Sequence, residues 1–232
     1  MTHKIEDFVG QGIYTVPDVA KLTRITPQNI YNWLYGDRPA GVSDKHAKKH
    51  PALLHQFELM NHIANVSFRD MIQIKFVCFF RAQGVSLQTI RIAAENAAKL
   101  LSTTHPFCSA KFKTDGATLL AEVFERNGDS SLVELKSMQH VFKDIVDPFL
   151  KTLEYDHDIV SKWWHSEGNG KVVVDPKCNF GKPTVAKCGY TTETLYDAYM
   201  ANGKSAKKVS EWYEVKQKDV EQAVDFEMRL AA

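Results

Sequence analysis

Residues 14–35 read YTVPDVAKLTRITPQNIYNWLY, and this stretch predicts two short helices joined by a tight turn. Thr15 lies three residues before Asp18, which is the spacing of a capping box, where two side chains satisfy backbone N–H groups at a helix start. Thr26 followed by Pro27 is a second start signal, because proline suits the first helical position after an N-cap. Two helices joined so closely predict a helix-turn-helix.

The second predicted helix carries a polar edge. Ile30 and Leu34 recur at helical spacing and should face the core, and Trp33 is expected to join them. The side chains left toward solvent include amides, which can form bidentate hydrogen bonds with adenine in the major groove of DNA. The pattern therefore predicts a recognition helix, and the competing interpretation is an amphipathic helical hairpin with a plain polar face.

The predicted DNA-binding residues comprise this edge, the turn before it and a basic segment after it. Residues 45–50 hold three lysines and two histidines, and they would form a wing that grips phosphates or else a solvated loop. The complete predicted set is Arg24, Thr26, Gln28, Asn29, Tyr31, Asn32, Tyr35, Arg38, Lys45, Lys48 and Lys49.

The charge distribution agrees with a nucleic-acid partner at one end of the chain. The net charge of the 232 residues is +1, but residues 1–110 carry +4 and residues 111–168 carry −4. No apolar run reaches the ~18 residues of a membrane span, and residues 1–8 lack a secretory apolar stretch. The four cysteines are scattered, which is typical of free thiols in a reducing cytosol, so we expect a cytoplasmic protein.

The remaining chain predicts a mainly α fold with small β-hairpins. A helix buried on several sides is expected from Ser67 to Gly84, either central to its domain or in a dimer interface, and a second helix should follow Ser86 to Leu101. The middle predicts a hairpin over 107–124 that turns at Asp115-Gly116, a helix over 135–153 with Pro148 kinking it, and a strand pair at 163–164 and 172–174. The predicted domains are 1–106, 107–170 and 171–232.

The last sixty residues predict a second unit shaped like a helix-turn-helix. Helices are expected from Thr191 or Thr192 to Met200, from Ser205 to Tyr213 and from Lys216 to Leu230. Its exposed face would bind DNA, bind a protein partner or simply pack, and the sequence leaves these three open. The residues on this face are Lys207, Lys208, Lys216, Gln217, Lys218 and Arg229.

Several motifs in this order resemble a known family. The run from Tyr14 to Trp33 resembles the opening of MerR-type regulators. The later motifs are VSFRDMI at 66–72, GVSLQTIR at 84–91, HPF at 105–107, KTDG at 113–116, WW at 163–164, VVDP at 173–176 and FGKP at 180–183. Together they are similar to VapB-like antitoxins with a MerR-like, winged helix-turn-helix at the front and a small domain of unknown function at the end.

The resemblance implies an antitoxin of a type II toxin–antitoxin system. It implies a repressor that binds its own operator, an inverted repeat in double-stranded DNA, as a homodimer, and that neutralises a PIN-like ribonuclease toxin. The family's arginine-containing turn after Gly-Lys-Pro is replaced here by Lys187-Cys188-Gly189-Tyr190. Because the sequence ends in a predicted helix, we expect any toxin to meet a folded surface in the last third of the chain.

Rival functions rest on weaker patterns. Asp144, Asp147, Asp156 and Asp158 could serve a metal-dependent nuclease, but a solvated acidic face explains them as well. The cysteines lack the close pairs of a zinc site, and no phosphate-binding glycine loop is present. We therefore expect no enzyme, no metal and no cofactor. The alternatives are a stand-alone MerR-like regulator without a toxin and an adaptor that binds protein but not DNA.

Overall fold

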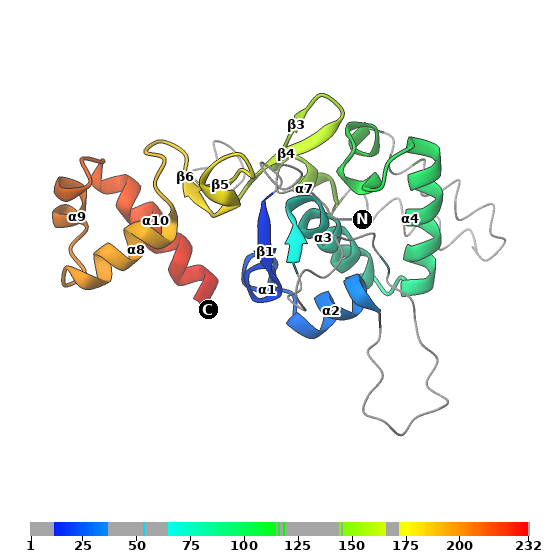
Figure 1. Cartoon of the computed structure of the whole chain (residues 1–232), viewed down its shortest axis with the longest axis horizontal. Coiled ribbons are helices and arrows are strands. Elements are labelled where there is room, and N and C mark those ends of the chain that lie inside the picture. Colours follow the sequence, from blue (N-terminus) through cyan, green and yellow to red (C-terminus); the bar gives the residue numbers. More distant parts are fainter. Residues whose placement is uncertain are drawn as a thin grey trace, which may run out of the picture. The chain divides into compact units, whose positions relative to one another are not determined.

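The computed structural model describes residues 12–36, 53, 65–114, 116, 118, 144, 146–165 and 172–231. The described chain is mainly helical with two small sheets (Figure 1). It divides into two compact units. The N-terminal unit comprises Tyr14–Leu150 and Asp156–Val160, and the C-terminal unit comprises Lys151–Tyr155 and Ser161–Ala232. The domain boundaries expected at residues 106 and 170 stay a prediction.

The N-terminal unit begins as its capping signals predict. Strand β1, Ile13–Thr15, pairs with β2, Asn65–Ser67. Helix α1, Val16–Thr23, starts at the Thr15–Asp18 capping box, and helix α2, Pro27–Tyr35, starts at the Thr26 N-cap. The predicted pair of short helices is therefore confirmed.

Helix α3, Phe68–Ala82, is the centre of this unit. Its N-cap Ser67 forms a capping box with Asp70, and nine of its fifteen residues are buried. Helix α4, Leu87–Leu101, starts at the Ser86 N-cap and turns its alanine-rich face inward. Both predicted helices are confirmed, and the burial of α3 on nearly every side identifies it as the central helix.

An aromatic cluster joins α3 to the segments that follow α4. The Phe76 ring centroid lies 5.6 Å from that of Phe107, 5.5 Å from Phe112 and 5.4 Å from Phe149. Phe76, Phe107 and Phe112 are fully buried. Rings at these distances in edge-on and tilted arrangements add to the stabilisation from burial.

The hairpin predicted over 107–124 is wrong where the structure describes it. Pro106–Cys108 form the 3-10 helix η2, and residues 110–114, 116 and 118 are helical. The Oγ atom of Ser109 accepts a hydrogen bond from the N–H of Phe112 at 3.0 Å and so caps this helix. The alternating Lys-Phe-Lys pattern resembled a strand, but its single phenylalanine enters the aromatic cluster from a helical turn instead.

The helix predicted over 135–153 is correct only in part. Residues 135–143 lie outside the described residues, and α7, Asp147–Leu150, ends before β3, Leu153–Asp156. Strand β3 continues through a turn into β4, Ile159–Trp164. A helix beyond Leu150 would remove the buried side chain of Leu153 from the sheet.

The C-terminal unit joins a small sheet to three helices. The sheet has the order β3-β4-β5-β6, with β5 at Val172–Val174 and β6 at Thr184–Val185. Strands β4 and β5 are antiparallel and pair Trp163 with Val174, which confirms the predicted strand pair. The predicted turn at Gly168-Asn169-Gly170 lies outside the described residues.

The three C-terminal helices also follow their start signals. Helix α8, Thr192–Ala201, starts at the Thr191 N-cap, α9, Ala206–Trp212, starts at Ser205, and α10 covers Gln217–Ala231. They enclose a core that includes Val185, Leu195, Val209 and Val220. None of the described helices combines the length and apolar character that crossing a membrane requires.

Removal of the central ring tests the aromatic cluster. Phe76→Ala should lower the free energy of unfolding by about 3–5 kcal/mol, because it leaves a cavity among buried rings. Urea denaturation followed by circular dichroism measures the change. Leu100→Ala on α4, where the side chain is 61% exposed, should change it by less than about 0.5 kcal/mol. An equal decrease in the free energy of unfolding in the two variants would contradict the assigned role of Phe76.

Candidate functional site

The turn between α1 and α2 is held by backbone and side-chain hydrogen bonds. The Thr23 hydroxyl donates to the carbonyl of Val19 at 2.6 Å, and the Arg24 N–H donates to the carbonyl of Ala20 at 2.8 Å. Arg24 has φ 59°, in the left-handed region that few non-glycine residues adopt. Lys75 of α3 donates to the carbonyl of Thr23 at 3.3 Å, so the central helix fixes the turn.

The orientation of α2 follows from its apolar residues. Ile30 is 0% and Leu34 1% exposed, and Trp33 is buried as predicted. The carbonyl of Trp33 also accepts a hydrogen bond from the N–H of Leu53 at 2.8 Å. Because these residues pack against the core, the rotation of α2 about its axis is fixed. The same packing determines which edge of the helix faces outward.

The outward edge of α2 is the predicted polar one. Gln28 and Asn29 are exposed, and Tyr31 and Asn32 are half-buried. The Gln28 Nε2 atom donates to the Asn32 Oδ1 atom at 2.7 Å, one helical turn away. Both amides belong to the predicted DNA-binding set. In the structure they are hydrogen-bonded to each other. A base edge would therefore bind both amides at once, or it would have to break the hydrogen bond between them.

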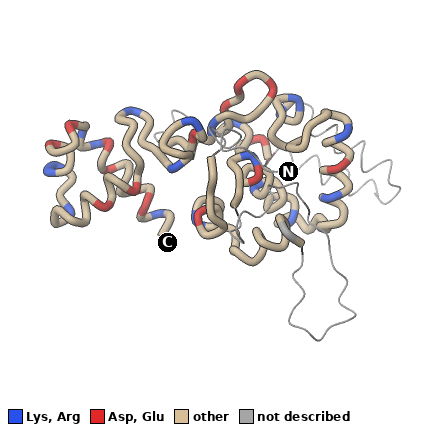
Figure 2. Tube along the Cα trace, viewed as in Figure 1, with Lys and Arg blue, Asp and Glu red and all other residues tan. Residues whose placement is uncertain are grey.

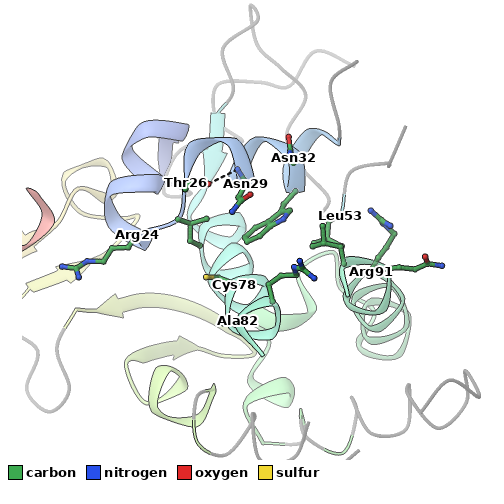
Figure 3. A pocket seen from close by; sticks show the side chains of 13 residues that line it. Arg24, Thr26, Asn29, Asn32, Leu53, Cys78, Ala82 and Arg91 are labelled. Atoms are coloured by element: carbon green, nitrogen blue, oxygen red, sulfur yellow. Dashed lines mark hydrogen bonds between the residues drawn. The ribbon is translucent and has the colours of Figure 1, made fainter. Parts of the chain in front are cut away.

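A groove of about 650 Å³ lies beside this edge (Figure 3). Asn29, Asn32 and Trp33 of α2 line one wall, and Gln88 and Arg91 of α4 line another. Arg81 and Cys78 of α3 line the part between them. Figure 3 shows Arg24 extending from the turn away from Arg91. The groove brings residues far apart in sequence next to the predicted recognition helix.

The electrostatics of the groove favour an anion. Arg24, Arg81 and Arg91 are among its lining residues, and none of the described lining residues carries a carboxylate. The Arg81 Nη1 atom donates to the carbonyl of Val85 at 2.9 Å, which orients its guanidinium. Burial lowers the pKa of Lys75 below its ordinary value, and Arg24 lowers that pKa further, although Cys78 opposes the shift. Guanidinium groups near amides suit phosphate oxygens.

The structure brings together only part of the predicted set. Arg24, Thr26, Asn29 and Asn32 all line the groove. The side chain of Tyr35 and all of Arg38, Lys45, Lys48 and Lys49 lie outside the described residues. Sequence reasoning missed Arg81, Gln88 and Arg91 because they stand at the junction of α3 and α4, and no motif in the first helices points to them.

The second predicted surface lies on the C-terminal unit. All six of its residues are exposed on α9, on α10 and just before α10, and they are Lys207, Lys208, Lys216, Gln217, Lys218 and Arg229. Acidic side chains are exposed among them at Glu211, Glu214, Glu221 and Asp225. Figure 2 shows the two signs of charge alternating along these helices. This surface therefore lacks the uniform positive charge that binds a phosphate backbone.

The aspartates weighed above for a metal-dependent nuclease do not form a metal site within the described residues. No group of three or more His, Cys, Asp or Glu side chains is placed there to hold a metal ion. His105 and Cys108 have partners of other kinds: the His105 Nε2 atom lies 3.2 Å from the Asp70 Oδ1 atom, and the Cys108 thiol donates to the carbonyl of Arg69 at 3.4 Å. Burial, with the nearby Asp70 carboxylate, raises the pKa of the Cys108 thiol.

Comparison with known proteins finds a family match, a curated relative and a solved structure with the same fold. Residues 172–226 match DUF433, a family described as a protein of unknown function. The chain is 25% identical over 231 residues to "Putative antitoxin VapB45" of Mycobacterium tuberculosis, and the match covers 92% of each chain. The crystal structure of Rv2018 from Mycobacterium tuberculosis has the same fold, with a TM-score of 0.70 at 20% identity over 91% of this chain and 96% of that one.

Two substitutions at Arg24 test whether its left-handed backbone conformation costs stability, because both of them remove the guanidinium. Glycine accepts φ 59° readily, whereas a β-branched side chain does not. Arg24→Gly should therefore be more stable than Arg24→Val by about 1–2 kcal/mol. Thermal and urea unfolding measure the difference, and identical stabilities would show that the turn does not constrain this residue.

Proposed function

We propose that this chain is the antitoxin of a type II toxin–antitoxin system, a DNA-binding repressor rather than an enzyme. In this proposal a homodimer binds an inverted repeat in its own operator through the N-terminal unit. The C-terminal unit neutralises a toxin, which the resemblance found in the sequence implies is a PIN-like ribonuclease. The single observation that carries the DNA part is the polar edge of α2 beside a groove with three arginines.

In the N-terminal unit, the residues that fix α2 differ from those that would contact DNA. Buried aliphatic residues fix α2, while Gln28, Asn29 and Asn32 stay toward solvent or the groove. Amides read base edges in the major groove, and the arginines of the groove would bind the backbone phosphates that position the helix. A dimer would place two such helices about one turn of DNA apart, which suits an inverted repeat.

The antitoxin part rests on the relative and on the charge of the C-terminal unit. The relative that covers 92% of this chain carries the name of an antitoxin. Surface charges of both signs on α9 and α10 suit a protein partner better than they suit a polyanion. In this proposal a toxin meets the folded surface formed by α9 and α10.

Two alternatives differ from this proposal in one property each. A stand-alone MerR-like regulator would bind the operator but no toxin. A protein-interaction adaptor would bind a partner but would show no salt-dependent DNA binding. Mobility shifts and calorimetry therefore separate all three functions.

The amide edge should control which DNA sequence is bound. Substitution of Gln28, Asn29 and Asn32 together by alanine should abolish the preference for the chain's own upstream DNA over an unrelated duplex, because each true base contact contributes about 1–3 kcal/mol. Mobility shifts over a salt series measure both affinities. Gln83→Ala removes an exposed amide at the end of α3 and should leave the preference intact. A preference that survives the triple substitution would show that α2 is not the recognition helix.

The groove arginines should supply phosphate contacts. Substitution of Arg81 and Arg91 by glutamine should weaken binding to all duplexes and reduce the slope of log affinity against log salt by about one to two. Substitution of Lys207 and Lys208 by glutamine removes the same charge from the C-terminal unit and should leave the slope unchanged. A reduced slope in the Lys207 and Lys208 variant, with an unchanged slope in the Arg81 and Arg91 variant, would show that the C-terminal unit contacts the DNA instead.

A further inference from the structure

A strained turn in the C-terminal unit presents an exposed phenylalanine. The 3-10 helix η4, Asn179–Gly181, has three consecutive residues with positive φ, at 48°, 56° and 82°. Asparagine and glycine tolerate this region, but phenylalanine rarely adopts it, so Phe180 is held in a strained conformation. The Phe180 side chain is nevertheless 88% exposed, so its ring gives little burial in return.

Hydrogen bonds from neighbouring residues hold this turn in place. The Asn179 Nδ2 atom donates to the hydroxyl of Thr184 at 3.0 Å and to the carbonyl of Gly189 at 2.9 Å. The N–H of Gly181 donates to the carbonyl of Cys178 at 2.9 Å. The turn is thus tied to β6 and to the loop before α8, and Val185 of β6 is fully buried. These hydrogen bonds hold the turn without any contribution from the Phe180 ring.

The segment that contains Phe180 is rich in lysine. Lys177, Lys182 and Lys187 are exposed in the same stretch of chain. Of the described carboxylates nearby in sequence, Asp175 is buried and accepts the N–H of Lys177 at 2.8 Å, and Glu193 lies 2.8 Å from the Lys182 Nζ atom. Lys182 is paired with Glu193, so the positive charge of this segment comes from Lys177 and Lys187. An apolar tip on a positively charged segment is complementary to an apolar pocket with carboxylates around its mouth.

We propose that Phe180 is the anchor by which the C-terminal unit docks on a protein partner, its ring entering an apolar pocket bordered by carboxylates. The proposal rests on the antitoxin function proposed above and specifies the surface that meets the toxin. A single ring on a rigid turn has the form of an interface hot spot, because its conformation is fixed before binding and little entropy is lost. Single-stranded nucleic acid would instead favour several stacking rings along a basic groove.

Phe180→Gly separates binding from folding. Glycine relaxes at φ 56°, so this variant should unfold at the same or a higher temperature than the wild-type chain while it lacks the ring. Phe180→Asn, which also tolerates the left-handed region, is the second variant. Phe180→Tyr keeps the ring, and Met200→Ala removes a side chain that is 46% exposed on α8 of the same unit.

Binding is measured by calorimetry between the full chain and the purified product of the reading frame next to its gene. We expect the wild-type chain to bind, Phe180→Gly and Phe180→Asn to weaken binding at least 30-fold, and Phe180→Tyr and Met200→Ala to stay within threefold. Binding of Phe180→Gly within threefold of wild type would overturn the anchor and leave the antitoxin function intact. Absence of wild-type binding would overturn the antitoxin function and the anchor together, whereas the DNA experiments above are independent of this result.

A second measurement tests the rival ligand. Fluorescence anisotropy with a labelled single-stranded oligonucleotide of mixed sequence should show no difference between wild type and Phe180→Gly. Loss of oligonucleotide binding in Phe180→Gly, with protein binding unchanged, would overturn the proposal in favour of a nucleic-acid contact.

Discussion

The carboxylate of Asp70 connects the segments on which the N-terminal unit depends. Its Oδ2 atom accepts the N–H and the hydroxyl of Ser67 at 3.2 and 2.6 Å, which starts the central helix α3. Its Oδ1 atom lies 3.2 Å from the Nε2 atom of His105, just before the turn that brings Phe107 into the aromatic cluster. Because Asp70 is only 1% exposed, these bonds form where water competes little, and an unpaired carboxylate there would be costly.

The geometry of the candidate site is fixed by its contacts with the core of the N-terminal unit. Lys75 of α3 reaches the carbonyl of Thr23 and holds the turn, and the burial of Ile30 and Leu34 leaves α2 one rotation only. The polar edge of α2 is thus placed by buried apolar residues on the other side of the helix. Rigid elements of this kind are typical supports for binding residues.

Local signals made much of this fold predictable, and long-range contacts limited the rest. Helix starts at Thr15, Thr26, Ser67 and Ser86 depend on hydrogen bonds within one turn, so the sequence alone reveals them. The segment around Phe112 was mistaken for a strand because its partner Phe76 lies outside any local window. The groove was missed for the same reason, since Arg81 and Arg91 join α2 only in three dimensions. Phe180 stands in the FGKP motif, but neither its φ angle nor its exposure can be inferred from the neighbouring residues in the sequence.

The thiol of Cys108 has a consequence for how this molecule can be handled. It is 0% exposed, and burial raises its pKa, so the reactive thiolate is scarce in the native state. Cys178, next to the Phe180 turn, is exposed. An alkylating dye would therefore mark Cys178 first on the native protein and the half-buried Cys78 and Cys188 more slowly, and it would reach Cys108 only when the N-terminal unit opens. The chain thus contains its own reporter of local opening, together with a natural attachment point beside the surface proposed to meet a partner.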